Sequence, residues 1–185
     1  EELTLLRRLI GRASEYCAEI LDWFYPPHCY HCGRFLSRSE DRMLCPGCVD
    51  RLESTRITPP FCATCGLSLP GSSGQNTCVS CRALRPRFDR ARAIFPYSGP
   101  AASVVKSYKY QGNYFLGPKL LRRAIERGWF PPDLTGCDCV VPVPLHRRRR
   151  VERGYNQATL LARVAAAHCD IPVLKNGLVR RRHTS

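Results

Sequence analysis

A short cysteine motif, CxxC, occurs four times between residues 29 and 81 and constrains the fold more than any other feature of this sequence. The four pairs are Cys29 and Cys32, Cys45 and Cys48, Cys62 and Cys65, and Cys78 and Cys81. Residues 27–48 align with residues 60–81 at a constant offset of 33 positions. The segment therefore consists of two copies of one unit, and each copy carries the four thiolates of a tetrahedral Zn²⁺ site.

The two copies are expected to fold around two zinc ions. Residues 27–81 show little apolar periodicity and many Gly and Pro residues, so bound metal has to supply much of the folding free energy. Gly33 and Gly66 directly follow the second cysteine of a pair, where a tight turn favours glycine. Duplication favours sequential pairing of the CxxC motifs within each copy, and cross-braced pairing between the copies is the alternative. The prediction is a double zinc ribbon over residues 26–85.

Other chemistries of these cysteines fit the sequence less well. A redox-active CxxC is disfavoured because no βαβ pattern surrounds any of the pairs, and the spacing suits zinc better than an iron–sulfur cluster. His28 and His31 flank the first pair. Four cysteines already suffice for each ion, so these histidines are interpreted as surface residues and not as ligands.

Residues 1–25 are predicted to form an amphipathic helix. Apolar residues recur at helical spacing through residues 3–24, and the polar side mixes acids with arginines, which favours packing on the protein over lying on a membrane. The segment is too charged to act as a secretory signal. No apolar run in the chain reaches the length of a membrane span. We therefore expect a cytoplasmic protein without a membrane span.

Residues 86–185 alternate between strand-like and helix-like patterns, which predicts an α/β domain with a parallel sheet. The expected strands are residues 90–98, 137–145 and 172–181. The expected helices are residues 99–110, 116–129 and 155–170.

A basic segment follows the predicted strand at residues 140–145. Residues 140–185 contain ten Lys or Arg and two acidic residues, within a chain whose formal net charge is +14. Ligands of open α/β sheets bind beyond the carboxyl ends of strands, near helix N-termini. A phosphate there would meet the amides of residues 154–157 and arginines of the loop at residues 147–153. A solvated run of arginines is the alternative.

Several motifs together resemble one family. They are "KYQG" at residues 109–112, "VPVPL" at 141–145, "RGYNQ" at 153–157 and "LVRRRHT" at 178–184, behind the paired CxxC ribbons. This combination resembles the ComF family of competence and DNA-utilisation proteins. The resemblance implies a type I phosphoribosyltransferase fold after the double zinc ribbon, so that residues 86–185 form the N-terminal portion of such a domain.

The resemblance also implies a ligand site. Arg153, Gly154, Asn156 and Gln157 would line the pyrophosphate side of a phosphoribosyl pyrophosphate site, with Lys109 at the ligand end of its helix. The chain has no match to the paired acids and "TTG"-like loop that hold the ribose phosphate and assist Mg²⁺ binding in such enzymes. The sequence is thus expected to be truncated relative to the family. No catalytic residue is assigned, no phosphoribosyl transfer is expected, and Mg²⁺ with phosphoribosyl pyrophosphate is expected only in a longer chain.

The function implied by the resemblance is DNA uptake or use in natural transformation. Single-stranded DNA and competence or DNA-processing proteins are the partners expected for the zinc ribbons. Two alternatives remain: a phosphoribosyltransferase that needs the missing loop, and a zinc-ribbon interaction protein without catalysis. Tyr30 and Phe61 are the aromatic residues of the ribbons best placed to stack on bases, and packing within the turns is their other interpretation.

Overall fold

The computed structural model divides the chain into two compact units, residues 1–50 and residues 51–185. The residues described are 23, 26–37, 41–69, 76–132 and 136–182. The predicted N-terminal amphipathic helix lies outside the described residues except for Trp23. The boundary between the units falls between the two CxxC copies, so each unit contains one copy. No helix of the described part of the chain is long and apolar enough to cross a membrane.

The two copies share one backbone arrangement. In the first copy Cys29 N–H donates to the Arg34 carbonyl at 2.7 Å and Gly33 N–H donates to the Cys29 carbonyl at 2.9 Å. In the second copy, 33 residues later, Cys62 N–H donates to the Leu67 carbonyl at 2.7 Å and Gly66 N–H donates to the Cys62 carbonyl at 2.9 Å. The isolated antiparallel bridges show the same offset and join His28 to Phe35 and Phe61 to Ser68. The sequence repeat is therefore also a structural repeat.

A short helix begins inside the second CxxC of each copy. Helix α2 (Pro46–Ser54) begins at the proline of "CPGC", a residue well suited to the first turn because its missing N–H has no helical partner there. Helix α3 (Val79–Leu84) begins inside the fourth CxxC, and the sulfur of Cys78 accepts from the N–H of Cys81 as its N-cap. The second CxxC of each copy thus stands at a helix start, where backbone amides favour negative charge on sulfur.

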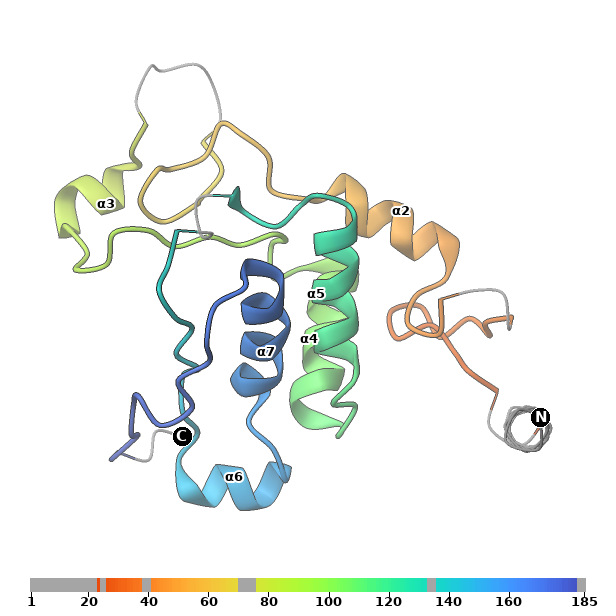
Figure 1. Ribbon diagram of the computed structural model, residues 1–185. Helices are drawn as coiled ribbons and strands as arrows, with labels where there is room; N and C mark the ends of the chain where they lie inside the picture. The colour runs from red at the N-terminus through yellow and green to blue at the C-terminus, as the bar shows by residue number, and fades with distance from the viewer. Residues whose placement is uncertain (1–22, 24–25, 38–40, 70–75, 133–135, 183–185) are drawn as a thin grey trace, which may run out of the picture. The chain divides into compact units, whose positions relative to one another are not determined.

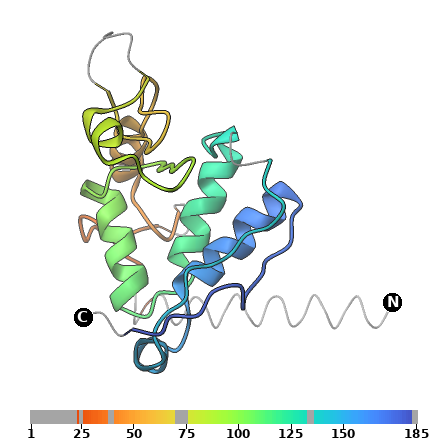
Figure 2. The ribbon, with the colours of Figure 1, turned by 90° about the vertical axis from the view of Figure 1, so that its left-hand side faces the viewer.

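Three helices form the body of residues 51–185 (Figures 1 and 2). Helix α5 (Leu116–Glu126) packs against both α4 (Gly99–Tyr110) and α7 (Gln157–Cys169). Helix α6 (Arg147–Arg153) lies near the end of the bundle where α4 ends and α7 begins. The buried side chains of the three packed helices include Val104, Leu116, Ala124, Ala162 and Ala166.

One large side chain joins these helices. Tyr108 is 2% exposed. A Cβ atom added to Gly117 would lie 2.6 Å from two ring atoms of Tyr108, so the absence of a side chain at Gly117 makes room for the ring. The Tyr108 hydroxyl donates to the Gln157 carbonyl at 2.7 Å. Tyr108 therefore fixes the end of α4 against α5 and against the start of α7.

The described residues contain no parallel sheet, contrary to the prediction from sequence. A single isolated parallel bridge joins Val140 to Val173, with hydrogen bonds of 2.9 Å from Val140 N–H to the Pro172 carbonyl and from Leu174 N–H to the Val140 carbonyl. The predicted strand at residues 140–145 contains Pro142 and Pro144. These prolines have no N–H to donate to a ladder, which explains why the pairing does not extend along this segment.

Candidate functional site

The cysteines of the first copy form one compact cluster in the unit of residues 1–50. The sulfur atoms of Cys29, Cys32, Cys45 and Cys48 all lie within 4.8 Å of one another. The Cys32 and Cys45 sulfurs are 3.6 Å apart. All four cysteines are free thiols, and all except Cys32 are buried. His28 and His31 do not belong to the cluster.

The cysteines of the second copy form a matching cluster in the unit of residues 51–185. The sulfurs of Cys62, Cys65, Cys78 and Cys81 again lie within 4.8 Å of one another, and those of Cys65 and Cys78 are 3.8 Å apart. The N–H of Cys78 donates to the Cys62 sulfur at 3.3 Å. The structure thus groups the cysteines sequentially, copy by copy, and not in the cross-braced arrangement.

Both clusters fit a zinc ion. Four sulfurs at about 2.3 Å from Zn²⁺ in a tetrahedron are about 3.8 Å from one another, which agrees with the sulfur–sulfur distances of 3.6 and 3.8 Å. A disulfide would bring two sulfurs to about 2 Å. Two four-cysteine clusters therefore suit two zinc ions, which would stabilise the two copies by linking each pair of CxxC turns.

In each cluster without metal, the electrostatic environment favours ionisation of one cysteine. Burial opposes ionisation of Cys29, but backbone N–H groups of Cys32, Cys45 and His31 outweigh it and lower the pKa of Cys29 to about 6. Backbone N–H groups, with that of Cys65 foremost, likewise lower the pKa of Cys62 to about 6. A second thiolate in the same cluster meets burial and like charge. Those effects raise the pKa of Cys81 to about 12, and they also raise the pKa of Cys48.

A second candidate site lies where α6 meets α7. Gly154 ends α6 with a φ of 72°, in the left-handed region that favours glycine. Asn156 is the N-cap of α7, and its side-chain oxygen accepts from the Ala158 N–H at 3.1 Å. Its amide nitrogen donates to the Val143 carbonyl at 3.1 Å. Asn156 thus joins the start of α7 to the segment before α6.

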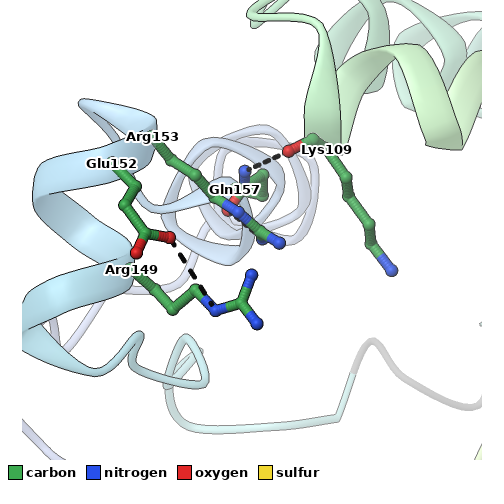
Figure 3. A network of polar contacts seen from close by, with 5 residues as sticks. All are labelled: Lys109, Arg149, Glu152, Arg153 and Gln157. Carbon is green, nitrogen blue, oxygen red and sulfur yellow. Dashed lines mark hydrogen bonds and ion pairs between the residues drawn. The ribbon is translucent and has the colours of Figure 1, made fainter. Parts of the chain in front are cut away.

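Gln157 is the central residue of this site and is 6% exposed. Its side-chain oxygen accepts from Arg153 at 3.5 Å, and its side-chain nitrogen donates to the Lys109 carbonyl at 3.5 Å. Figure 3 shows the Arg153 guanidinium beside Gln157, the Arg149 side chain extending from α6, and the Lys109 side chain extending away from the carbonyl that Gln157 bonds. The residues come from α4, α6 and α7. The buried amide of Gln157 therefore joins the Arg153 guanidinium to the backbone at Lys109.

A cavity of about 550 Å³ adjoins this group. Four of the five residues expected at a phosphoribosyl pyrophosphate site line it: Lys109, Arg153, Asn156 and Gln157. Gly154 does not line the cavity. Most of the remaining lining is apolar, from α4, α5, α7 and the segment at residues 143–145. The cavity therefore presents a polar, cationic rim beside an apolar wall.

The structure differs from the sequence analysis in two details around this site. Residues 147–153, expected as a loop, form α6, and Val143, expected in a buried strand, is 65% exposed. The sequence analysis also missed the tyrosines at the site. Tyr155 donates a hydrogen bond from its hydroxyl to the Tyr108 carbonyl, and the Arg153 guanidinium lies 5.1 Å from the Tyr110 ring centroid. Their sequence signal is the three tyrosines of residues 108–114, which precede Tyr155 by 41 residues or more.

Comparison with known proteins agrees with the cysteine clusters. The family described as "Double zinc ribbon domain" matches residues 20–83. No solved structure matches the chain.

Curated relatives extend the similarity beyond the ribbons. The chain is 30% identical over 164 residues to competence protein F of Haemophilus influenzae, which covers 87% of this chain and 69% of that protein. It is 27% identical over 122 residues to the DNA utilization protein YhgH of Escherichia coli, and 27% identical over 126 residues to its namesake in Salmonella typhimurium. The chain spans about half of the length of these two DNA utilization proteins, 53% in each case.

Proposed function

Because the chain belongs to the ComF family, we propose that it acts on DNA during uptake or use and binds single-stranded DNA at the end of the bundle where α4, α6 and α7 meet. The observation that carries the proposal is that Lys109 and Arg153 line one cavity beside Gln157, with Arg149 one helical turn before Arg153 on α6 (Figure 3). The two zinc ions would hold the ribbons, which would add a surface for DNA or for competence and DNA-processing proteins.

The charge around this end supports an anionic ligand. Residues 106–119, from the last turn of α4 to the first turn of α5, carry three lysines and no acidic residue. The one acid of α6, Glu152, lies 3.9 Å from the Arg149 guanidinium. Guanidinium groups suit phosphate because their planar donors match its oxygens. A strand of phosphates would therefore find several donors here and little repulsion.

The names of the relatives support the DNA context. One is a competence protein and the others are DNA utilization proteins. Natural transformation is the process that this proposal assigns to the chain, and the cytoplasm is the compartment in which we expect it to act.

The test is the salt dependence of DNA binding by the zinc-loaded chain. Three phosphate contacts predict that the logarithm of the affinity for single-stranded DNA falls against the logarithm of salt concentration with a slope of about −2. That slope corresponds to about a 20-fold loss between 50 and 200 mM salt. Arg153→Gln should reduce the magnitude of the slope by about 0.7. Electrophoretic shifts or fluorescence anisotropy measure both quantities.

A matched control separates this site from the ribbon. Arg82 is an exposed arginine of α3, next to the second cysteine cluster. Arg82→Gln should leave the slope unchanged if DNA binds at α6. An effect of Arg82→Gln without an effect of Arg153→Gln would move the DNA site to the ribbon, and equal effects would show that DNA is not confined to α6. Binding that is absent or insensitive to salt would refute the proposal.

A second candidate function is the binding of a pyrophosphate-bearing ligand in the cavity. The observation that favours it is that Lys109, Arg153, Asn156 and Gln157 line this one cavity. Because this chain has only the residues of the pyrophosphate side, inorganic pyrophosphate is the ligand we propose for it. Calorimetric titration should detect its binding to the chain and a loss of that binding in Gln157→Glu, which would place a carboxylate beside the anion. Equal affinity of the two proteins would argue against this function.

A further inference from the structure

Three exposed aromatic side chains lie at the end of α4 and on the loop that leads to α5. Tyr110, the last residue of α4, is 67% exposed, Tyr114 is 61% exposed and Phe115 is 42% exposed. We call these three residues the aromatic platform. Exposed aromatic rings lose the stabilisation that burial would give them, so such a group on one short loop indicates a surface that meets a ligand.

The loop that carries the platform is held in place by its own hydrogen bonds. The N–H of Tyr114 donates to the Gly112 carbonyl at 2.8 Å, and the N–H of Leu116 donates to the Asn113 carbonyl at 3.1 Å. The Asn113 side chain donates to the hydroxyl of Ser107, a buried residue of α4, at 2.7 Å. A ligand therefore meets rings whose backbone is already ordered, which lowers the entropic cost of binding.

The platform adjoins the cationic group around Gln157. The Arg153 guanidinium lies 5.1 Å from the centroid of the Tyr110 ring. The Tyr114 ring meets that of Tyr155, in the loop before α7, at 6.1 Å edge to face. Lys109 directly precedes Tyr110. Aromatic faces and phosphate-binding cations thus occupy the same end of the bundle.

We propose that Tyr110 and Tyr114 stack on unpaired bases of single-stranded nucleic acid whose phosphates bind Arg149, Arg153 and Lys109. Sequence-tolerant binding of single strands combines these two elements, an aromatic surface for bases and a cationic track for the backbone. Bases within a duplex are already stacked, so this surface selects single strands. The inference rests on the proposed function and assigns to it the residues that read bases.

The test compares oligonucleotides that differ only in their bases. A labelled single strand and an abasic strand of the same length carry the same phosphates, so their difference in affinity isolates base stacking. Fluorescence anisotropy at 50 mM salt measures both for the zinc-loaded wild-type chain, for Tyr110→Ala with Tyr114→Ala, and for Tyr110→Phe with Tyr114→Phe.

The expected pattern has three parts. The double alanine variant binds the normal strand more weakly by at least about fivefold for each tyrosine removed. The double phenylalanine variant binds it within about twofold of wild type, because the rings remain. Wild type binds the abasic strand about as weakly as the alanine variant binds the normal strand, and the alanine variant no longer distinguishes the two strands.

Tyr97 supplies the matched control. It is 63% exposed and precedes α4, whereas Tyr110 ends that helix, so the two lie about 18 Å apart along its axis. Tyr97→Ala should therefore bind like wild type. Circular dichroism of each variant checks that the helices remain.

Different results would refute base stacking by the platform and DNA binding by the chain. If wild type binds DNA and the alanine variant binds equally well, or if wild type binds the abasic strand as tightly as the normal one, the platform does not read bases. A phenylalanine variant as weak as the alanine variant would also exclude stacking. If wild type binds neither strand at 50 mM salt, the proposed function fails and the inference fails with it.

Discussion

Replacing Gly117 by alanine should destabilise residues 51–185, although the same change in a helix usually stabilises. Gly117 is the second residue of α5, where alanine gains at most about 1 kcal/mol over glycine. The new Cβ would lie 2.6 Å from two ring atoms of Tyr108 and 2.9 Å from a third. Comfortable carbon contacts are about 3.5 to 4.0 Å, so the ring or the helix has to move by roughly 1 Å.

The magnitude follows from how firmly Tyr108 is held. Its ring is buried and its hydroxyl is bonded to the Gln157 carbonyl at 2.7 Å, so it cannot rotate outward without losing that bond. Overpacking of a buried site costs about 1 to 3 kcal/mol. After the gain in helix propensity, we expect Gly117→Ala to lower the free energy of unfolding by about 1 to 2 kcal/mol.

The assay is urea unfolding of the zinc-loaded protein, followed by the fluorescence of Trp129 in a Trp23→Phe background. Trp129 lies just beyond α5, with its N–H donating to the Ala124 carbonyl at 2.8 Å, so it reports on this helix. Tyr108→Leu removes the clash, and in that background Gly117→Ala should cost nothing or stabilise. A Gly117→Ala protein as stable as wild type would refute the steric argument, as would the same loss in both backgrounds.

Gly47 is the matched control for this prediction. It is likewise the second residue of its helix, α2, and no atom lies within 4 Å of an added Cβ. Gly47→Ala should therefore leave stability unchanged or raise it by up to about 1 kcal/mol, as measured by circular dichroism during urea unfolding.

Two further predictions concern metal binding and the start of α7. Metal analysis should give two zinc ions per chain. Calorimetry in several buffers at pH 7.5 should show that zinc binding releases fewer than four protons per ion. The reason is that Cys29 and Cys62, with pKa values of about 6, are already ionised at this pH. Below pH 6 these two thiolates are also protonated, so the number of protons released per ion should rise toward four and the affinity for zinc should fall. A number of released protons that does not change with pH would contradict this prediction. Asn156→Ala should lower the free energy of unfolding by about 1 to 2 kcal/mol, because it removes both the cap of α7 and the bond to the Val143 carbonyl. Asn156→Asp keeps the cap acceptor and should recover about half of that loss in urea unfolding, whereas equal losses in both variants would show that the cap contributes little.

The cysteine clusters could be predicted from the sequence because the zinc ligands occur at short, regular spacings along the chain. Each CxxC turn fixes two sulfurs within four residues, and the offset of 33 then identifies which turns belong to one copy. Helix α4 has the predicted bounds, Gly99–Tyr110, because its Gly-Pro start and the Gly after its end are also local signals. The sequential grouping of the sulfurs needed the structure, since either pairing satisfies the spacing.

The predicted sheet failed for a nonlocal reason. An apolar run such as residues 140–145 forms a strand only where neighbours supply partners for its backbone, and two of its residues are prolines. The aromatic platform was missed for a related reason. Nothing in the spacing of Tyr110 and Arg153 shows that their side chains meet, because that contact depends on how α4, α6 and α7 pack.

The hydrogen bonds of two tyrosines hold the end of α4 at a fixed distance from the start of α7. Tyr108 donates to the carbonyl of Gln157, and Tyr155 donates back to the carbonyl of Tyr108, so the two helix ends are joined in both directions. Lys109 follows one of these anchors and Arg153 precedes the other by two residues. Contacts within the helix bundle thus set the backbone separation of the two cations. In the proposed function, the spacing of an anion's charges should therefore matter as well as their number.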